Sequence, residues 1–281
     1  MRERLLEVRK NKAVHPLGAA SVRRVHSTLR SALNTAVKRR LIPHNPLAYV
    51  ELPTGRRPKA VVWTDERVAA YAATGQRPAV AVWTAKQTAT FLDHAAGDDL
   101  YALYHLVALR GLRRGEAVAL RWTEVNLDAA QLTVDRQVVQ LGWQTAESPP
   151  KSGSTRTIPL DATTTDVLRV HRARQAGWRL AAGPAWVDTG RVFTHRDGTG
   201  LHPHAVTAPF RELTAQAGLP PIRLHDLRHG AATLALAAGA DLKTRSEMLG
   251  HSTIVITADT YTSVLPEHAR TAAESTAALI A

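Results

Sequence analysis

The sequence predicts an α+β fold that is mainly α-helical and contains one small antiparallel β-sheet. Two patterns in the 281 residues lead to this prediction. Apolar side chains recur at three- and four-residue spacing in several separate segments, which is the period of amphipathic helices. Apolar and polar residues alternate over Gln131–Gln140, which is the period of a strand, and Thr155–Leu160 is its predicted partner.

The first predicted helix covers Gly18–Arg40. Its apolar face is formed by residues three or four positions apart, namely Val22, Val25, Leu29, Leu33 and Val37. Two prolines in the segment 41–47 forbid its continuation. The basic residues Arg23, Arg30 and Lys38 lie away from the apolar face. They could lie along a DNA backbone or form an ordinary solvated surface, and the sequence favours neither.

The chain is predicted to divide into two domains joined by a linker. Residues 1–52 form a partial helical domain. Residues 53–82 mix prolines, basic clusters and short apolar runs without a sustained period, which is typical of a linker with transient structure. Thr84 precedes a helical segment and is a predicted N-cap, so the second domain covers residues 83–281.

The second domain is predicted to contain the other helices and the sheet. A glycine corner at Gly111–Arg113 separates two of these helices. The residues between the two strands, Gly142–Ser154, are predicted to form a long, flexible tip. The predicted helices after residue 96 are Leu100–Leu109, Arg114–Trp122, Thr164–Leu180, Pro203–Ala217, Leu224–Ala238 and Leu242–Gly250, followed by an amphipathic stretch at Glu267–Leu279.

The net charge of +12 is concentrated at the amino end of the chain. Residues 1–60 hold 14 basic and 3 acidic residues, whereas the rest of the chain holds 22 basic and 21 acidic residues. Such a positive field favours a polyanionic partner, because cations that neutralise phosphates release counterions. A solvated, solubilising basic surface is the alternative.

Composition also disfavours several classes of protein. The absence of cysteine excludes disulfides and thiolate metal sites. No apolar run in the sequence is long enough to span a membrane. The first residues mix both signs of charge and lack the apolar block of a secretory signal, so a cytoplasmic location is expected.

Residues 225–261 collect side chains suited to attack on a phosphodiester. The segment begins H-D-L-R-H and ends L-G-H-S-T-I-V-I-T-A-D-T-Y. A phosphodiester repels nucleophiles through its negative charge, so a site without a metal must supply fixed cations such as Arg228. The hydroxyl of Tyr261, with an ordinary pKa near ~10, needs a base or a strongly cationic pocket at neutral pH, and His225 could supply the base.

Together with two upstream segments, these motifs resemble the tyrosine recombinases of the phage integrase family. The segment G-L-R-R-G-E, Gly111–Glu116, resembles the first arginine motif of the family. The segment P-K-S-G-S-T-R-T-I-P-L, Pro150–Leu160, resembles the β-hairpin that carries the family's lysine. The resemblance implies a helical catalytic domain with a small antiparallel β-sheet, preceded by a partial helical core-binding domain that clamps DNA.

The resemblance implies a site-specific recombinase that cleaves and rejoins DNA to integrate or excise a phage or mobile element. Tyr261 would attack the scissile phosphate and form a 3′-phosphotyrosyl link. His225 would manage the tyrosine proton. The oxygens of the phosphate would be held by Arg113, Arg228 and His251.

Two supporting roles follow from the same resemblance. Lys151 would protonate the leaving 5′ oxygen. Glu116 would be a buried partner that orients Arg113, although a first-turn acid can also simply complement the helix dipole. No metal or other cofactor is expected: His225 and His229 are four residues apart, but no acidic residue lies where a third ligand is expected.

The implied partner is double-stranded DNA that carries specific recombination sites, in the nucleoid of a bacterium or on phage DNA. Members of the family act as homotetramers that exchange carboxyl-terminal segments, and Glu267–Leu279 is the candidate for that contact. Accessory or excision factors are further expected partners.

The amino end departs from the family pattern. Integrases usually carry a full helical core-binding domain, whereas here only residues 1–52 precede the predicted linker, so the amino end is expected to be truncated. Three alternatives to a working recombinase stay open. Residues 232–252 have the residue spacing of a helix-turn-helix, as in a non-enzymatic DNA-binding regulator. A type IB topoisomerase would share the tyrosine chemistry, and an integrase remnant could bind or nick DNA without productive recombination.

Overall fold

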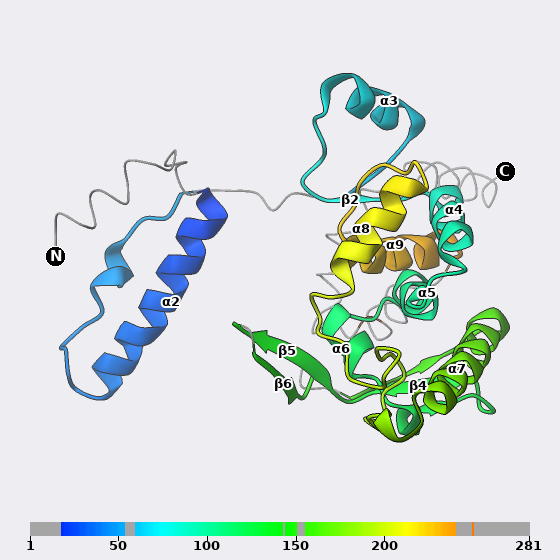
Figure 1. The fold of residues 1–281 in the computed structure, drawn as a ribbon. Coiled ribbons are helices and arrows are strands. Elements are labelled where there is room, and N and C mark those ends of the chain that lie inside the picture. Colours follow the sequence, from blue (N-terminus) through cyan, green and yellow to red (C-terminus); the bar gives the residue numbers. More distant parts are fainter. Residues whose placement is uncertain (1–17, 54–59, 143, 151–154, 240–248, 250–281) are drawn as a thin grey trace, which may run out of the picture. The chain divides into compact units, whose positions relative to one another are not determined.

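The computed structural model describes residues 18–53, 60–142, 144–150, 155–239 and 249, and Figure 1 draws its fold. The chain forms two compact units, residues 1–58 and residues 59–281, which are described in turn. Helices with small β-sheets make up the described residues, which confirms the predicted α+β class. Within the described ranges, no helix combines the length and the apolar character needed to cross a lipid bilayer.

The described residues of the first unit, 18–53, form helix α2 (Ala19–Lys38) and a short 3-10 helix, η1 (Pro46–Tyr49). Asn45 holds the segment that returns along the helix. Its amide donates to the carbonyl of Arg30 at 3.1 Å and to Oδ1 of Asn34 at 2.7 Å. The predicted first helix is therefore confirmed, but no residue of α2 is buried, including those of the predicted apolar face.

The predicted linker over 53–82 is wrong for its second part, which folds with the second unit. The elements of this part are β1 (Val61–Val62), α3 (Asp65–Thr74) and β2 (Ala81–Val82). The two strands pair in parallel, and the residues that directly follow them, Trp63 and Trp83, are buried. Strands of two residues are too short to show an alternating period, which is why the pattern indicated a linker.

Four aromatic rings form the centre of the second unit. They belong to Trp83, Phe91, Tyr104 and Phe210, and the centroids of the contacting rings lie 5.1–5.9 Å apart. Three of the rings come from helices, namely α4 (Ala85–Ala95), α5 (Tyr101–Arg110) and α8 (Thr207–Gln216). All residues of Ala102–Ala108 are buried, and α5 packs against both α4 and α9.

Most predicted helix boundaries hold to within a few residues. Thr84 caps α4 as predicted, through a reciprocal capping box with Gln87. The helix predicted at Arg114–Trp122 ends earlier, at Ala119, because the chain leaves the helical conformation at Leu120. The remaining helical elements are α6 (Arg114–Ala119), η2 (Trp122–Glu124), α7 (Ala162–Ala182), η3 (Gly183–Ala185) and α9 (Leu224–Ala237). The helices predicted at Leu242–Gly250 and Glu267–Leu279 lie outside the described residues, apart from Leu249, which is buried.

The β-structure differs from the predicted pair of strands. Its strands are β3 (Val125–Asn126), β4 (Gln131–Val134), β5 (Gln137–Leu141), β6 (Gln144–Ser148) and β7 (Arg156–Pro159). The predicted pairing of the segments around β4 and β7 is confirmed, in an antiparallel sheet of order β3-β4-β7. However, β5 pairs with β6 in a separate hairpin, so much of the predicted flexible tip is a strand. Side chains of β6 are mostly exposed and polar, which removes the alternation that would reveal it.

The β5–β6 hairpin packs closely on helix α6. Figure 1 shows the hairpin as a two-stranded ribbon beside this helix. A Cβ atom at Gly115 would lie 2.5 Å from the carbonyl oxygen of Val138 in β5, closer than real Cβ atoms come. The second glycine of the G-L-R-R-G-E segment thus permits the hairpin to reach the helix that follows Arg113.

Candidate active site

Arg113 lies at the corner between α5 and α6. Gly111 ends α5 in the left-handed conformation, with φ of +66°, which glycine adopts without steric cost. A side chain at Gly111 would also collide with Leu249, whose Cδ2 atom lies 2.5 Å from the Cβ position. Arg113 is then the N-cap residue of α6. The predicted glycine corner therefore places Arg113 at the start of a helix, two positions after a glycine that lies against Leu249.

Glu116 is buried and binds two arginines. Its side chain has no exposed surface, and its carboxylate accepts hydrogen bonds from the backbone N–H of Arg113 at 2.8 Å and from Nη1 of Arg113 at 2.6 Å. Arg156 donates to both oxygens of the same carboxylate, from Nη1 at 3.1 Å and from Nη2 at 2.7 Å. Burial raises the pKa of the Glu116 carboxyl, but the hydrogen bonds and charge of Arg156, and then those of Arg113, outweigh it and lower the pKa. Glu116 is thus an ionised acid that sets the direction of Arg113.

Arg156 is a residue of this cluster that the sequence reasoning missed. It lies on β7, where Arg156 and Ile158 point inward while Thr157 and Pro159 are exposed. Its side chain is only 8% exposed. An arginine at an inward position of an alternating strand needs a buried acidic partner. The alternation in the segment T-R-T-I-P-L places Arg156 on the same face as Ile158, and this pattern could have identified Arg156 from the sequence.

Arg228 is buried in α9 and connects two parts of the chain. Its residue exposure is 2%. One guanidinium nitrogen donates to the carbonyl of Gly111, and the other donates to the carbonyl of Leu249. The side chain therefore reaches the corner that precedes Arg113.

The amino end of α9 is held by a second arginine–acid pair. Asp226 is 2% exposed and accepts hydrogen bonds from the backbone N–H and the guanidinium of Arg223 at 2.7–3.0 Å. This pair forms a capping box at the first turn of the helix. The turn that carries His225 and Arg228 is thereby fixed in place.

His225 and His229 lie one turn apart on α9, with ring centroids 5.0 Å apart and planes at 86°. The pKa of the His225 imidazole is lowered to about 4, first by loss of hydration and then by the charges of His229 and Arg228. Loss of hydration also lowers the pKa of His229. Both rings are therefore neutral at pH 7, as a proton acceptor must be. In the part of the chain that the structure describes, no three metal-ligating side chains gather into a cluster.

The lowered pKa of His225 predicts how the protein responds to acid. The unfolded chain has a histidine pKa of about 6.5, so the neutral ring favours the folded state above that pH. This stabilisation is lost as the pH falls from about 6.5 towards about 4. The side chain keeps exposed surface, and water there offsets part of the lost hydration. We therefore expect an NMR titration of the DNA-free protein to give His225 a pKa below the ordinary histidine value of about 6.5. The resonance is assigned by its loss in His225→Gln, and a midpoint at or above about 6.5 would contradict the expectation.

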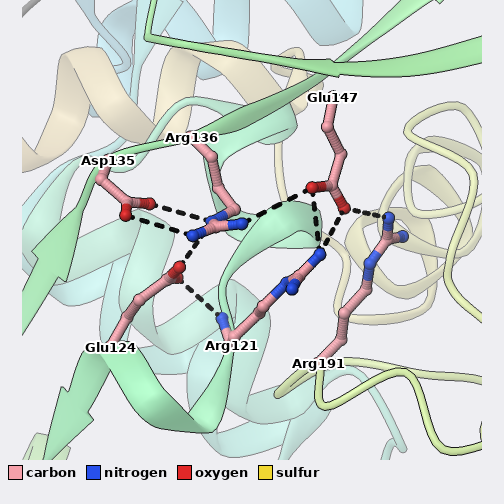
Figure 2. Close-up of polar contacts among 6 residues, drawn as sticks. All are labelled: Arg121, Glu124, Asp135, Arg136, Glu147 and Arg191. Atoms are coloured by element: carbon pink, nitrogen blue, oxygen red, sulfur yellow. Dashed lines mark hydrogen bonds and ion pairs between the residues drawn. The ribbon is translucent and has the colours of Figure 1, made fainter.

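A cluster of three arginines holds the β5–β6 hairpin at Glu147, as Figure 2 shows. The Glu147 carboxylate accepts hydrogen bonds from Arg191 at 2.8 Å and from Arg121 at 3.0 and 3.1 Å, and it pairs with Arg136 at 3.6 Å. Hydrogen bonds from Arg191 and Arg121 lower the pKa of the Glu147 carboxyl despite partial burial. Glu147 lies four positions before Lys151 in the sequence, so the strand that leads towards the lysine is anchored by charge.

Three of the predicted catalytic residues, Lys151, His251 and Tyr261, lie outside the described residues. The three candidate DNA-binding cations belong to the first unit. There, Arg30 and Lys38 are exposed, whereas Arg23 is partly buried and donates to the carbonyl of Pro53 at 2.7 Å. Within the described residues, the structure joins Arg113 and Arg156 to Glu116, and it places Arg228 in contact with Gly111, two positions before Arg113. His225 lies in the first turn of the helix that carries Arg228.

The arrangement of these elements is the fold of tyrosine recombinases. The Tn1549 transposon integrase, in a structure with transposon right end DNA, matches it with a TM-score of 0.66 at 18% identity, over 97% of this chain and 83% of that chain. The chain belongs to the phage integrase family, whose model matches residues 82–268. The resemblance identified from the four motifs is confirmed.

Relatives of the chain extend the comparison. A tyrosine recombinase XerC-like protein of Caldanaerobacter subterraneus is 35% identical over 192 residues, which are 64% of this chain and 49% of the relative. The ICEBs1 integrase of Bacillus subtilis is 24% identical over 264 residues, which are 93% of this chain and 66% of the relative. The chain thus spans from about half to about two thirds of the length of these two relatives.

Proposed function

We propose that this chain is a site-specific DNA recombinase that cleaves and rejoins DNA strands through a 3′-phosphotyrosyl intermediate. The observation that carries the proposal is the set of cations around one turn of the chain. Arg113 follows Gly111 closely and is held by Glu116, and Arg228 donates to the Gly111 carbonyl. One arginine contacts this turn from α9 and another begins α6 directly after it, which suits a site that stabilises negative charge developing on a phosphate.

In the proposed reaction, the hydroxyl oxygen of Tyr261 forms a bond to the scissile phosphorus, and the bond from phosphorus to the 5′ oxygen breaks. The tyrosine proton passes to His225, whose lowered pKa keeps it neutral and able to accept. Lys151 gives a proton to the 5′ oxygen, which leaves as a hydroxyl. The non-bridging oxygens are bound by Arg113, Arg228 and His251. Because the phosphoester is retained, the 5′ hydroxyl of another strand can reverse the step.

The proposed partner is double-stranded DNA with specific recombination sites, on which four copies assemble. The positive charge of residues 1–60 supports DNA as the partner, and the names of the integrase relatives support a role in integrating or excising a mobile element. Residues 1–52 would clamp the DNA, with Arg23, Arg30 and Lys38 facing its backbone, and residues 83–281 would contain the chemistry. Accessory factors would set the direction of the reaction, and the protein would act at the nucleoid.

Capture of a covalent adduct tests the proposed function. The full chain is incubated with a pool of nicked suicide duplexes whose sequence is randomised on both sides of the nick, and adducts are isolated on denaturing gels and sequenced. The wild-type chain is expected to give adducts that share a sequence. Tyr261→Phe is expected to give none, because it lacks the attacking oxygen. Adducts from both proteins would contradict the role of Tyr261.

The same assay separates the alternatives. Binding of the pool without any adduct would contradict a recombinase and favour a non-enzymatic regulator. Relaxation of a supercoiled plasmid without exchange between duplexes would favour a type IB topoisomerase. Adducts without exchange between two selected duplexes would favour a remnant that only nicks DNA.

A further inference from the structure

We propose that Arg156 is a positioning residue for the phosphate site: it keeps the cluster around Glu116 positively charged and sets the orientation of Arg113. The inference rests on the proposed function, because it concerns the same cleavage step. Arg156 itself is assigned no contact with the DNA. It acts through Glu116, which both arginines share.

Charge balance is the first argument. Glu116 is ionised and has no exposed surface, so nearby groups rather than water must compensate its charge. If Arg113 were its sole partner, the pair would be neutral and would attract a phosphate weakly. Arg156 binds the same carboxylate, so the two guanidinium groups and one carboxylate together carry a net charge of +1. The second arginine thereby preserves a cation for the phosphate.

Geometry is the second argument. Arg156 binds both carboxylate oxygens in a planar fork, and this fixes the plane of the Glu116 carboxylate. Arg156 is itself held in the sheet, where β7 pairs with β4 and Arg156 lies opposite Val134. Arg113 meets the carboxylate through its backbone N–H and Nη1. The orientation of Arg113 is therefore determined by the sheet, through Arg156 and Glu116.

Stability alone does not require this cluster. Buried ion pairs are often no more stabilising than well-packed apolar residues of similar volume, because each charge loses its hydration. Two arginines on one buried acid are better explained by the positive electrostatic potential that they produce near Arg113. This distinction between a structural and an electrostatic role can be measured.

The test uses single-turnover cleavage of the suicide duplex selected with the wild-type chain. Arg156→Gln is expected to slow cleavage roughly 10- to 100-fold, the loss seen when residues that orient metal ligands are replaced. Its affinity for the duplex, measured by gel shift, is expected to stay within about threefold of wild type, because Arg156 does not contact DNA. Arg156→Lys keeps the charge without the fork and is expected to recover part of the rate. Arg169→Gln, which changes an exposed arginine of α7, is the matched control and is expected to cleave at the wild-type rate.

Two readouts respond to charge and not to a general loss of structure. A duplex with a methylphosphonate at the scissile position lacks the charge that Arg113 neutralises. Arg156→Gln is therefore expected to slow cleavage of this duplex by only about threefold or less. In a Glu116→Gln background the carboxylate that would neutralise Arg113 is gone. In this background, Arg156→Gln is expected to slow cleavage by a much smaller factor than it does in the wild-type chain.

Cleavage by Arg156→Gln within about twofold of wild type would overturn the inference. An equal reduction of the cleavage rate on the phosphodiester and the methylphosphonate duplex would also overturn it, since that result is expected if Arg156 has a purely structural role. If circular dichroism shows that Arg156→Gln does not fold, Arg156→Lys is compared on the two duplexes in the same way. Failure of the proposed function looks different, because the wild-type chain itself would then give no adduct.

Discussion

Arg113→Ala is expected to slow strand cleavage by about 10²–10³-fold, the usual effect of removing one donor that stabilises a charged transition state. The fold should survive the change. Glu116 keeps its two hydrogen bonds from Arg156, so no buried charge is left without compensation. We expect the free energy of unfolding to fall by only about 1–3 kcal/mol, for the lost hydrogen bond to a charged group. Single-turnover cleavage and urea unfolding measure the two effects.

Arg114→Ala is the matched control for this prediction. Arg114 is adjacent in the G-L-R-R-G-E segment, but its Nη1 donates to the hydroxyl of Thr207 in α8 at 3.1 Å. Its loss is expected to slow cleavage less than about tenfold, because the lost contact is a single hydrogen bond to a hydroxyl of α8 and does not involve Glu116. If Arg114→Ala were the more damaging of the two variants, Arg113 would not be the catalytic arginine.

Arg228→Ala is expected to damage both the fold and the reaction. It removes the donor from the carbonyls of Gly111 and Leu249, which would then be buried without these hydrogen bonds. The cost is expected to be about 3–5 kcal/mol of unfolding free energy, the range for removing one partner of a buried charged contact. Cleavage, measured at a temperature where the variant is folded, should fall by about 10²–10³-fold as a phosphate-binding cation is lost.

Arg228→Lys separates the two roles of this residue. A lysine keeps the positive charge but cannot donate in a planar fork to two carbonyls. We expect it to be more stable than Arg228→Ala and still slow in cleavage. A loss of stability below about 1 kcal/mol in Arg228→Ala would show that the two carbonyl contacts do not hold the Gly111 corner.

Local sequence patterns predicted the helices because those patterns are regular and long. The apolar face of α2 and the N-cap of α4 at Thr84 are each formed by residues that lie within a few positions of each other. The β-structure was harder to predict. Residues of β6 show no apolar alternation, and the hairpin is held instead by backbone pairing and by the arginines around Glu147, which are distant in sequence.

The second part of the predicted linker folds with the second unit, and a related reason hid this in the sequence. Trp63 and Trp83 each follow a strand of two residues, and such short strands leave no period to detect. The burial of Trp83 depends on Phe91 and Phe210, and its indole N–H donates to the carbonyl of Pro220, 137 positions away. No local pattern contains that information.

The sequence by itself determined the family of this protein and the kinds of chemical group in its site, because each motif is a contiguous segment whose residue types can be read directly. It placed Arg113 at a glycine corner and Arg228 beside His225. Only the tertiary structure decided that Arg156 shares the carboxylate of Glu116, 40 positions away, and that Arg228 donates to Gly111, 117 positions away. Burial and pairing of this kind depend on which distant segments pack together, and residue spacing along the chain does not encode that.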